Sequence, residues 1–519
     1  MQMTASHTVS RHVHGNRRMF VFVVMIALSD FLVFDQTPGL NVFLLSVSLM
    51  AAAMLAASRP LPPLKAAGLV CVSALAAAPL IEAPTWSGFL VATLGVIYVA
   101  LAVARLLPKR PTRIALVFLR FLPVIPTKLL RDSREHAASH YDRTSFGATG
   151  RSLAGWALPL GMGLIFLLLF RAANPLIEIG LRNIDLTFLL RFLDISRLGF
   201  WLVAAGFIWA LMRPRLIRKR ILGPSKGAPA RGKVDALLDH GALVRSLCVF
   251  NLLFALQTLL DLVYLWGGAD LPAGMSHAEY AHRGAYPLVA TALLAAGFVL
   301  IAMRRDGPGD RSPLIRALVV AWISQNVLLC LSSIVRLDLY VEAYSLTGLR
   351  IAAGIWMGLV AAGLVFILLR IALGRSSEWL ISMNLATLLT VLYLAAYFDF
   401  SGFIARFNVE NAIERQQAGT PLDISYLASL GPSAIPALDL YLASMPNDIC
   451  TQRQAYNARN RLAREFATRS MDWRSWSYRA DRMEDYLLST ALNESGNGDI
   501  TGGIKFWGTP NGASYPCRR

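Results

Sequence analysis

The chain has 519 residues, of which 55% are hydrophobic and 16% are charged, and its formal net charge is +18 at pH 7. Charged residues make up about a quarter of an ordinary soluble domain, so this composition excludes a soluble globular protein and predicts a membrane protein. The Lys and Arg residues stand in short gaps between apolar stretches and form no basic face of a soluble domain, which argues against nucleic acid as a partner. We interpret the positive excess as a topology signal and as attraction to anionic lipid headgroups.

Eleven apolar stretches approach the length of about 20 residues at which a helix crosses a bilayer. They cover residues 19–34, 41–58, 64–81, 86–107, 154–173, 198–212, 242–266, 285–303, 314–335, 351–373 and 379–398. The first could instead be a signal peptide, but no cleavage site of the A-x-A type follows it, so we interpret it as a helix. The sequence therefore predicts an all-α fold, a polytopic transmembrane bundle of about 11 spans over residues 19–400 after a tail at 1–18.

Two further stretches are interrupted. Residues 114–130 contain Arg120, Pro123 and Pro126, and residues 177–195 carry five charged side chains among apolar ones. Each charge at the centre of a crossing helix would cost several kcal/mol. We interpret both stretches as interfacial or re-entrant helices, and if either crosses, the span count changes.

Basic residues occupy every second gap between the predicted spans. With the N-terminus in the cytoplasm, the arginines before residue 19, the 109–151 loop, the 213–220 run and Arg304-Arg305 all lie on the cytoplasmic side, and the opposite gaps are acidic or balanced. This distribution obeys the positive-inside rule. An odd number of spans then places the C-terminal region outside the cytoplasm.

The last 119 residues differ from the rest, because acids and bases are nearly balanced and no run is long enough to cross a bilayer. Asp423 precedes the apolar run 424–430, Gly431-Pro432 interrupts the chain, and residues 451–471 have apolar side chains at helical spacing. The pattern predicts a small extracytoplasmic helical domain at 401–492. Residues 493–519, rich in Gly, Asn and Thr, are expected to be a flexible tail.

The five cysteines fall into two groups. Cys71, Cys248 and Cys330 lie in predicted spans, where we expect them to be small buried packing residues. Cys450 and Cys517 lie in the predicted extracytoplasmic region and could form a disulfide. The alternative, two unrelated thiols, stays open because spacing alone fixes no geometry.

Polar residues inside the predicted spans are the best functional leads, since they are costly in hydrocarbon unless paired or hydrated. Helical spacing puts one polar stripe on residues 257–264 and another on residues 325–336, with Asp261 and Arg336 at similar depths. We predict that these two meet and line a polar pocket that opens outward. The proposed pocket residues are Gln257, Asp261, Tyr264, Gln325, Arg336 and Asp338. The alternative is an interhelical ion pair that only fixes helix packing.

Three segments carry a resemblance to a known family. The stretch 338–350 reads D-x-Y-x-x-A-Y-x-L-T-x-x-R, and it is joined by 278–284 and 423–438. Together they resemble a bacterial domain-of-unknown-function family of polytopic membrane proteins, with similarity from about residue 240 to 476. Ser345 stands where the resemblance leads us to expect Gly. The resemblance implies a bacterial inner-membrane location and a helical C-terminal part, and it implies no activity.

Two hypotheses of function follow. In the first, the pocket handles a small polar solute, an ion or a lipid headgroup, in transport or envelope maintenance. In the second, the protein is a membrane sensor or scaffold whose C-terminal helical domain binds a protein partner. We expect no catalytic residues, no metal and no cofactor, because the sequence has no nucleotide-binding G-x-x-x-x-G-K-[ST] loop and no convincing catalytic or metal-ligand constellation.

Overall fold

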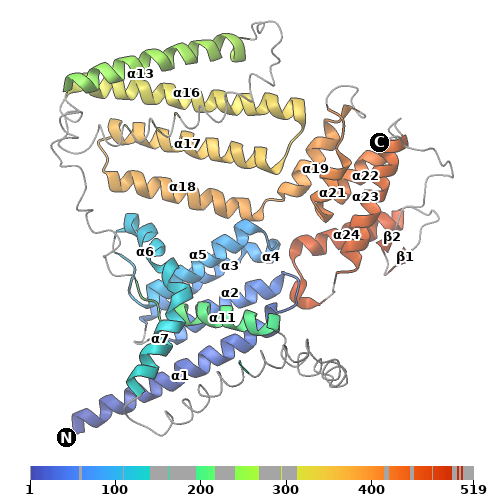
Figure 1. Cartoon of the computed structure of the whole chain (residues 1–519). Helices are drawn as coiled ribbons and strands as arrows, with labels where there is room; N and C mark the ends of the chain where they lie inside the picture. The colour runs from blue at the N-terminus through green and yellow to red at the C-terminus, as the bar shows by residue number, and fades with distance from the viewer. Residues whose placement is uncertain are drawn as a thin grey trace. The chain divides into compact units, whose positions relative to one another are not determined.

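A computed structural model of the chain describes residues 2–57, 61–108, 110–140, 162, 195–216, 240–267, 291, 294, 298, 312–413, 420–444, 449–469, 472–493, 500–501 and 504–505. These residues are almost entirely helical (Figure 1). They form two compact units, unit 1 (Met1–Arg220 with Asp472–Ser477) and unit 2 (Ile221–Met471 with Tyr478–Arg519). Nearly all of the predicted spans 154–173 and 285–303, the predicted segment 177–195 and most of the predicted tail lie outside the described residues.

Unit 1 is a group of helices around one apolar core. Its helices are α1 (Gln2–Val33), α2 (Leu40–Leu55), α3 (Pro63–Ala77), α4 (Pro79–Glu82), α5 (Trp86–Val103), α6 (Ile114–Phe121), α7 (Ile125–His140) and α11 (Ile195–Met212), with 3-10 turns at Pro111–Arg113 and Leu122–Val124. The core draws mainly on α2, α5 and α11, which are uncharged or nearly so and rich in Ala, Val and Leu. Gly95 lets α3 and α5 approach closely, because a Cβ there would lie 2.3 Å from the Cβ of Ala76.

Residues 114–130, predicted to be interfacial or re-entrant, form no continuous helix. The 3-10 turn Leu122–Val124 separates α6 from α7 at the position of Pro123. One face of this segment is buried at Val117 and Phe121, while Leu119 and Leu130 are exposed. This two-sided character is typical of a helix that lies along a surface, and its place relative to a membrane stays a prediction.

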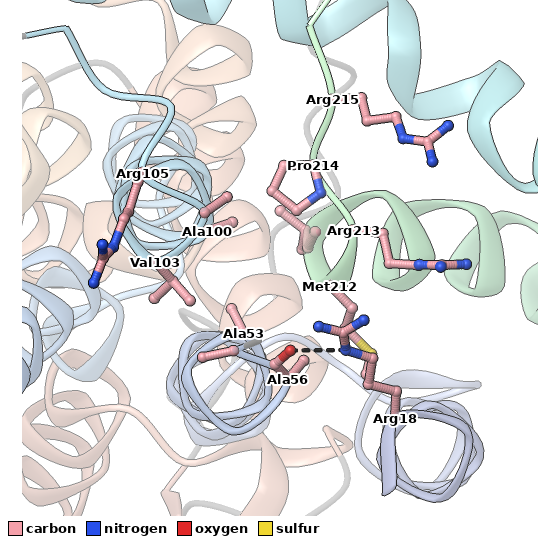
Figure 2. Close-up of a pocket in the computed structure, with 13 residues that line it drawn as sticks. Arg18, Ala53, Ala56, Ala100, Val103, Arg105, Met212, Arg213, Pro214 and Arg215 are labelled. Carbon is pink, nitrogen blue, oxygen red and sulfur yellow. Dashed lines mark hydrogen bonds between the residues drawn. The ribbon is translucent and has the colours of Figure 1, made fainter. Parts of the chain in front are cut away.

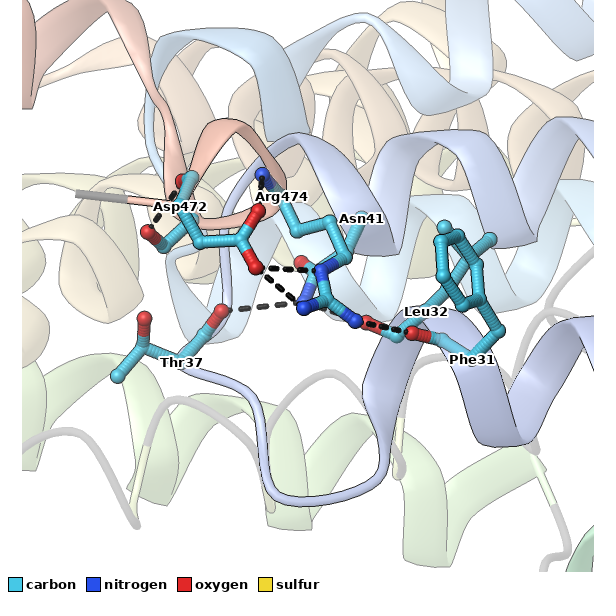
Figure 3. Close-up of polar contacts among 7 residues, drawn as sticks. Phe31, Leu32, Thr37, Asn41, Asp472 and Arg474 are labelled. Atoms are coloured by element: carbon cyan, nitrogen blue, oxygen red, sulfur yellow. Dashed lines mark hydrogen bonds and ion pairs between the residues drawn. The ribbon is translucent and has the colours of Figure 1, made fainter. Parts of the chain in front are cut away.

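The segment Asp472–Ser477, far away in sequence, is part of unit 1. Its 3-10 turn η6 (Trp473–Ser475) lies against the turn between α1 and α2 (Figure 3). Nη1 of Arg474 donates to the carbonyl oxygen of Phe31 at 2.7 Å, and the guanidinium lies 5.0 Å from the Phe31 ring centroid. Hydrogen bonds from Arg474 lower the pKa of the Asp472 carboxyl. The contact therefore places the Arg474 guanidinium at the C-terminal end of α1.

Backbone contacts complete this attachment. The amide of Leu40 donates to the carbonyl oxygen of Trp476 at 2.7 Å. Asn41 secures the turn itself, because its Nδ2 donates to the carbonyl oxygens of Leu32 at 2.8 Å and Thr37 at 3.1 Å (Figure 3). A Cβ on Gly39 would lie 2.3 Å from the carbonyl carbon of Ser475. Only glycine therefore allows the two backbones to come this close.

Unit 2 begins with long apolar helices. They are α13 (His240–Leu260), which continues as a π-helical turn (Asp261–Trp266), α16 (Pro313–Tyr344), α17 (Gly348–Ala372) and α18 (Ser377–Tyr397). In Figure 1 they lie side by side in this order, and each packs against the next. Ser312 and Ser376 cap α16 and α18 by accepting from the amides of Ile315 and Trp379.

The rest of unit 2 is a helical lobe. It contains α19 (Phe400–Glu410), α21 (Ile424–Ser429), a 3-10 turn at Pro432–Ala434, α22 (Ile435–Ala443), α23 (Ile449–Ala467), α24 (Tyr478–Asn493) and the antiparallel strands β1 (Ile500–Thr501) and β2 (Ile504–Lys505). Asp423 caps α21 through the amide of Tyr426 at 2.9 Å, and Gly431 has a φ of +79° at the predicted break. Helices α19 to α24 bury one apolar cluster, and the long helices before them bury another.

Six helical segments among the described residues are long and apolar enough to cross a membrane. They are Pro63–Glu82, Trp86–Val103, His240–Trp266, Pro313–Tyr344, Gly348–Ala372 and Ser377–Tyr397, and two shorter apolar helices lie at Leu40–Leu55 and Ser196–Met212. Large apolar side chains on α13, such as Leu252, Leu256 and Leu259, are more than half exposed. A water-facing surface rarely carries so many, so these helices have the character of membrane helices. These six candidate spans are fewer than the 11 predicted, and two of the other predicted spans lie almost wholly outside the described residues, so the number of crossings stays a prediction.

Candidate functional site

Asp261 and Arg336 form an ion pair between the end of α13 and α16. Asp261 is 1% exposed and Arg336 is 2% exposed. The Oδ1 atom of Asp261 accepts hydrogen bonds from Nη2 of Arg336 and, at 2.9 Å, from Nε2 of Gln257. The two helices run parallel, because Asn251 of α13 contacts Leu318 of α16, and Asp261 and Arg336, which pair with each other, each lie further along their helices. Two residues 75 positions apart thus meet because each stands about the same number of turns from its helix start.

The local backbone at this pair is irregular. The α-helical hydrogen-bonding pattern of α13 changes to a π-helical one from Asp261 to Trp266. Nε1 of Trp266 donates to Oγ of Ser332 on α16 at 3.4 Å, a long hydrogen bond. Single π-helical turns inside α-helices are rare and are frequent at functional sites, because they re-aim a side chain at the expense of regular hydrogen bonding. The turn begins at the residue that carries the buried carboxylate.

Several buried polar atoms near this interface lack partners among the described residues. They are Oδ2 of Asp261, Oε1 of Gln325, Oδ1 of Asn251, Oδ1 of Asn326 and Nε1 of Trp322. A buried polar atom without a partner costs about 1–3 kcal/mol, and more when it is charged. Four of the five atoms are acceptors. Unsatisfied acceptors thus outnumber unsatisfied donors among these atoms.

The structure brings together only part of the predicted pocket. Asp261, Gln257 and Arg336 form one connected group, whereas Gln325 lies three helical turns before Arg336 and does not bond to it. Tyr264 is partly buried in the π-helical turn and makes no hydrogen bond to the group. Asp338 is exposed and stays outside the group among the described residues, because two residues rotate a helix by about 200°.

Sequence reasoning missed Asn326 and Trp322 as members of this interface. Asn326 is fully buried, and its Nδ2 donates back to the carbonyl oxygen of Trp322 at 2.7 Å. The sequence did contain a signal for this position, because the amide side chain of Asn326 stands within a long apolar stretch. The π-helical turn leaves no signal in hydropathy, since it adds no residue type that a regular helix would exclude.

The turn between α16 and α17 is held by the lobe. Asn408 on α19 binds both backbone groups of Leu346, as it accepts from the amide nitrogen at 2.7 Å and donates to the carbonyl oxygen at 2.9 Å. The hydroxyl groups of Ser345 and Thr420 lie 2.6 Å apart, and the amide of Gly348 donates to the Tyr426 hydroxyl at 3.0 Å. A cavity of about 390 Å³ lies at this junction. The turn and the lobe therefore form one connected structure.

The motif at 338–350 has a structural explanation at the same turn. Arg350 donates to the carbonyl oxygens of Tyr344 and Ser345, and its guanidinium lies 4.5 Å from the Tyr340 ring centroid. The rings of Tyr340 and Tyr344 pack with centroids 4.8 Å apart. Ser345 has a φ of +66°, a conformation that favours glycine. The Tyr, Leu and Arg residues of the motif thus shape the turn that the lobe holds.

The cysteines differ partly from expectation. Cys330 is buried as predicted, but Cys71 and Cys248 are exposed, because they stand on the outer faces of α3 and α13 rather than on the packed ones. Cys450 at the start of α23 is disulfide-bonded. Its proposed partner Cys517 lies outside the described residues, so that pairing stays a prediction.

These features define a helical protein with several membrane-type helices and a buried charged pair between two of them. The chain belongs to the family described as "Domain of unknown function (DUF4153)", whose model matches residues 20–441. The match covers most of the chain and ends within α22, so it includes the charged pair and the 338–350 motif but stops short of Trp473. Neither the curated proteins nor the solved structures contain a match.

Proposed function

We propose that this chain is a multi-pass protein of a bacterial inner membrane that handles a small cationic or hydrogen-bond-donating solute at the Asp261–Arg336 pair. The main support is that Oδ2 of Asp261, a buried carboxylate oxygen, accepts no hydrogen bond from the described residues. Gln257 and Arg336 both bind the other oxygen. A pair that served packing alone would be expected to satisfy both oxygens.

The proposed topology has the N-terminus in the cytoplasm and the lobe outside it. In unit 1, Asp472–Ser477 lies at the α1–α2 turn, the end of α1 opposite the basic residues before residue 19. In unit 2, the α16–α17 turn and the end of α18 both adjoin the lobe. Both observations support an outer side formed by the same gaps that the charge pattern assigns to it. A reporter enzyme fused after Asn493 that is active in the cytoplasm would contradict this topology.

Transport through the pair can be tested in proteoliposomes that contain the full chain and a trapped pH-sensitive dye. Proton, sodium and methylammonium gradients would be imposed in turn under a clamped membrane potential. We expect faster dissipation of at least one gradient than in protein-free liposomes, and loss of that flux in Asp261→Asn. Asp338→Asn is the matched control, since it removes an exposed carboxylate from the same helix as Arg336. The proposal fails if no gradient responds, or if Asp261→Asn transports like the wild type.

A second function, a sensor or scaffold, is favoured by the junction between the lobe and the α16–α17 turn. A partner that binds the lobe would act directly on α16, the helix that carries Arg336, through Asn408 and Leu346. Co-purification of a defined protein with the full chain, lost when residues 401–519 are deleted and kept in Asp261→Asn, would favour this function over transport.

A further inference from the structure

One face of the segment formed by α6 and α7 is fixed to the rest of unit 1. Its buried residues follow one another at intervals of three or four, the spacing of one helix face, and this spacing continues through the 3-10 turn between the two helices. They are Val117, Phe121, Val124, Lys128 and Asp132. Asp132 accepts from Nζ of Lys128 at 2.5 Å and from Nε1 of Trp209 on α11 at 3.0 Å. Packing and hydrogen bonds thus determine which face of the segment points inward.

The segment lies at the end of unit 1 where several other helices end. Ala56, Val103 and Met212 stand at the C-terminal ends of α2, α5 and α11, and they line one cavity together with Arg18 of α1 (Figure 2). Nε of Arg18 donates to the carbonyl oxygen of Ala56 at 2.9 Å. In Figure 1, α7 runs across the direction of α11, against which it packs. The segment therefore crosses the end of this helix group and does not continue along it.

The opposite face of the segment is also apolar, and it is exposed. Leu119, Leu122 and Leu130 are 65%, 48% and 59% exposed. Leu119 and Leu130 each stand two residues from a buried residue on either side, and two residues rotate a helix by about 200°. A segment that only covered the end of unit 1 in water would be expected to carry polar side chains on its outer face. Three large apolar residues there indicate that an apolar phase covers this face.

The charges beside this outer face all have the same sign. Residues 104–131 contain seven Lys and Arg residues and no Asp or Glu. Arg120 and Arg131 directly follow Leu119 and Leu130, so each stands about 100° around the helix from an exposed leucine. Neither arginine forms an ion pair with a described residue. The exposed apolar face is therefore flanked on one side by two cations that the rest of unit 1 does not neutralise.

An anionic lipid surface fits both properties of the outer face. Acyl chains would contact the exposed leucines, and headgroup phosphates would contact the flanking arginines, whose long side chains keep the charge at headgroup level. The bilayer surface is also close at hand. Trp86–Val103 is long and apolar enough to cross a membrane, and Val103, its last residue, lies at the end of unit 1 that the segment crosses. The apolar phase and the anionic charge are thus available at the same place.

We infer that α6 and α7 lie in the surface of the membrane and bind anionic phospholipid headgroups through Arg120 and Arg131. This inference selects an interfacial position over a re-entrant one for residues 114–130, because the segment crosses the helix ends and carries its cations beside its exposed apolar face. The proposed topology places the segment at the cytoplasmic leaflet, whose anionic lipids attract basic segments. The inference does not depend on the transport proposed for Asp261.

The test introduces the photoreactive residue p-benzoylphenylalanine in place of Leu119 in the full chain. The chain is irradiated in the membranes of the expressing cells and in proteoliposomes with equal amounts of phosphatidylglycerol and phosphatidylcholine, and mass spectrometry identifies what is attached. The measured quantity in proteoliposomes is the ratio of phosphatidylglycerol adducts to phosphatidylcholine adducts. It is compared between Arg120→Gln/Arg131→Gln and the matched control Arg406→Gln/Arg461→Gln, which removes two exposed arginines from the lobe.

We expect lipid adducts with a ratio above one when no arginine is replaced, a fall of up to about five-fold for each of Arg120 and Arg131, and no change in the lobe variant. High salt should also lower the ratio, because it screens exposed charges, and this measurement needs no arginine variant to fold. The inference is overturned by a ratio of one at low salt, by an equal fall in the lobe variant, or by attachment to a second copy or another protein instead of lipid. Transport by Asp261→Asn is measured separately, so either proposal can fail alone.

Discussion

Two buried Asp–Arg pairs in unit 2 consist of the same residue types but differ in how the carboxylate is hydrogen-bonded. In the lobe, both carboxylate oxygens of Asp439 are bonded, Oδ1 to Nε of Arg459 at 2.8 Å and Oδ2 to the Tyr486 hydroxyl at 3.0 Å. Between α13 and α16, Asp261 has both donors on one oxygen and none on the other among the described residues. The lobe pair is complete in itself, and the helix pair has an unused acceptor.

The largest expected effect is on the lobe pair. Arg459→Met leaves Asp439 buried without its cation, so we expect the free energy of unfolding of the lobe to fall by about 3–5 kcal/mol. Hydrogen exchange of α22 and α23 in the full chain measures it. Arg461→Met is the control on the same helix, because that arginine is exposed and lies 3.9 Å from an exposed Glu465, a pair worth about 0–1 kcal/mol. Equal effects of the two substitutions would show that the lobe pair is not a packing element.

Substitution of the arginine in the Asp261–Arg336 pair is expected to lower the free energy of unfolding by a smaller amount. Arg336→Gln also leaves a buried carboxylate without its cation, but the new Gln side chain can itself donate a hydrogen bond, which Met cannot, and Gln257 still binds Asp261, so we expect a loss of about 1–3 kcal/mol. Thermal unfolding of the full chain in detergent measures this loss. A loss larger than that of Arg459→Met would mean that the Asp261–Arg336 pair contributes more to stability than the Asp439–Arg459 pair. That result would contradict the difference proposed between the two pairs.

Tyr486→Phe makes the lobe pair resemble the helix pair, since it removes the donor to Oδ2 of Asp439. We expect a loss of about 0.5–1.5 kcal/mol. Burial and the Asp439 carboxylate raise the pKa of Tyr486 to about 12, above the value of about 10 for a free phenol. Its contribution to stability is complete below pH 10 and declines as the pH rises through 12. Phenolate absorbance should accordingly show one tyrosine fewer titrating near pH 12 in the variant.

The smallest change in the free energy of unfolding is expected at Ser345, in the turn between α16 and α17 that contacts the lobe. Ser345→Gly relieves a left-handed φ that costs about 1–3 kcal/mol, but it loses the hydroxyl contact with Thr420 and adds backbone entropy to the unfolded chain. These terms nearly cancel, so we expect a net change within about 1 kcal/mol of zero. Ser345→Ala keeps the strain and loses the hydroxyl, and should be the less stable of the two in thermal unfolding. The reverse order would mean that the turn is not strained.

Particular residues show what the sequence could predict. The contact between Asp261 and Arg336 followed from helical spacing, because two parallel helices carry periodic residues to the same depth. The inclusion of Asp338 was inconsistent with that same geometry, since it lies about 200° around the helix from Arg336. The π-helical turn and the attachment of Asp472–Ser477 to unit 1 were beyond prediction. The first leaves no trace in residue type, and the second depends on backbone approach at Gly39.

The double variant Asp261→Asn/Arg336→Gln in proteoliposomes tests the central claim most directly. Neutralising both partners leaves no buried charge, so we expect the variant to unfold within about 1 kcal/mol of the wild type and yet to dissipate none of the imposed gradients that the wild type dissipates. Full flux at normal stability would contradict the claim and reduce the pair to a helix-packing contact.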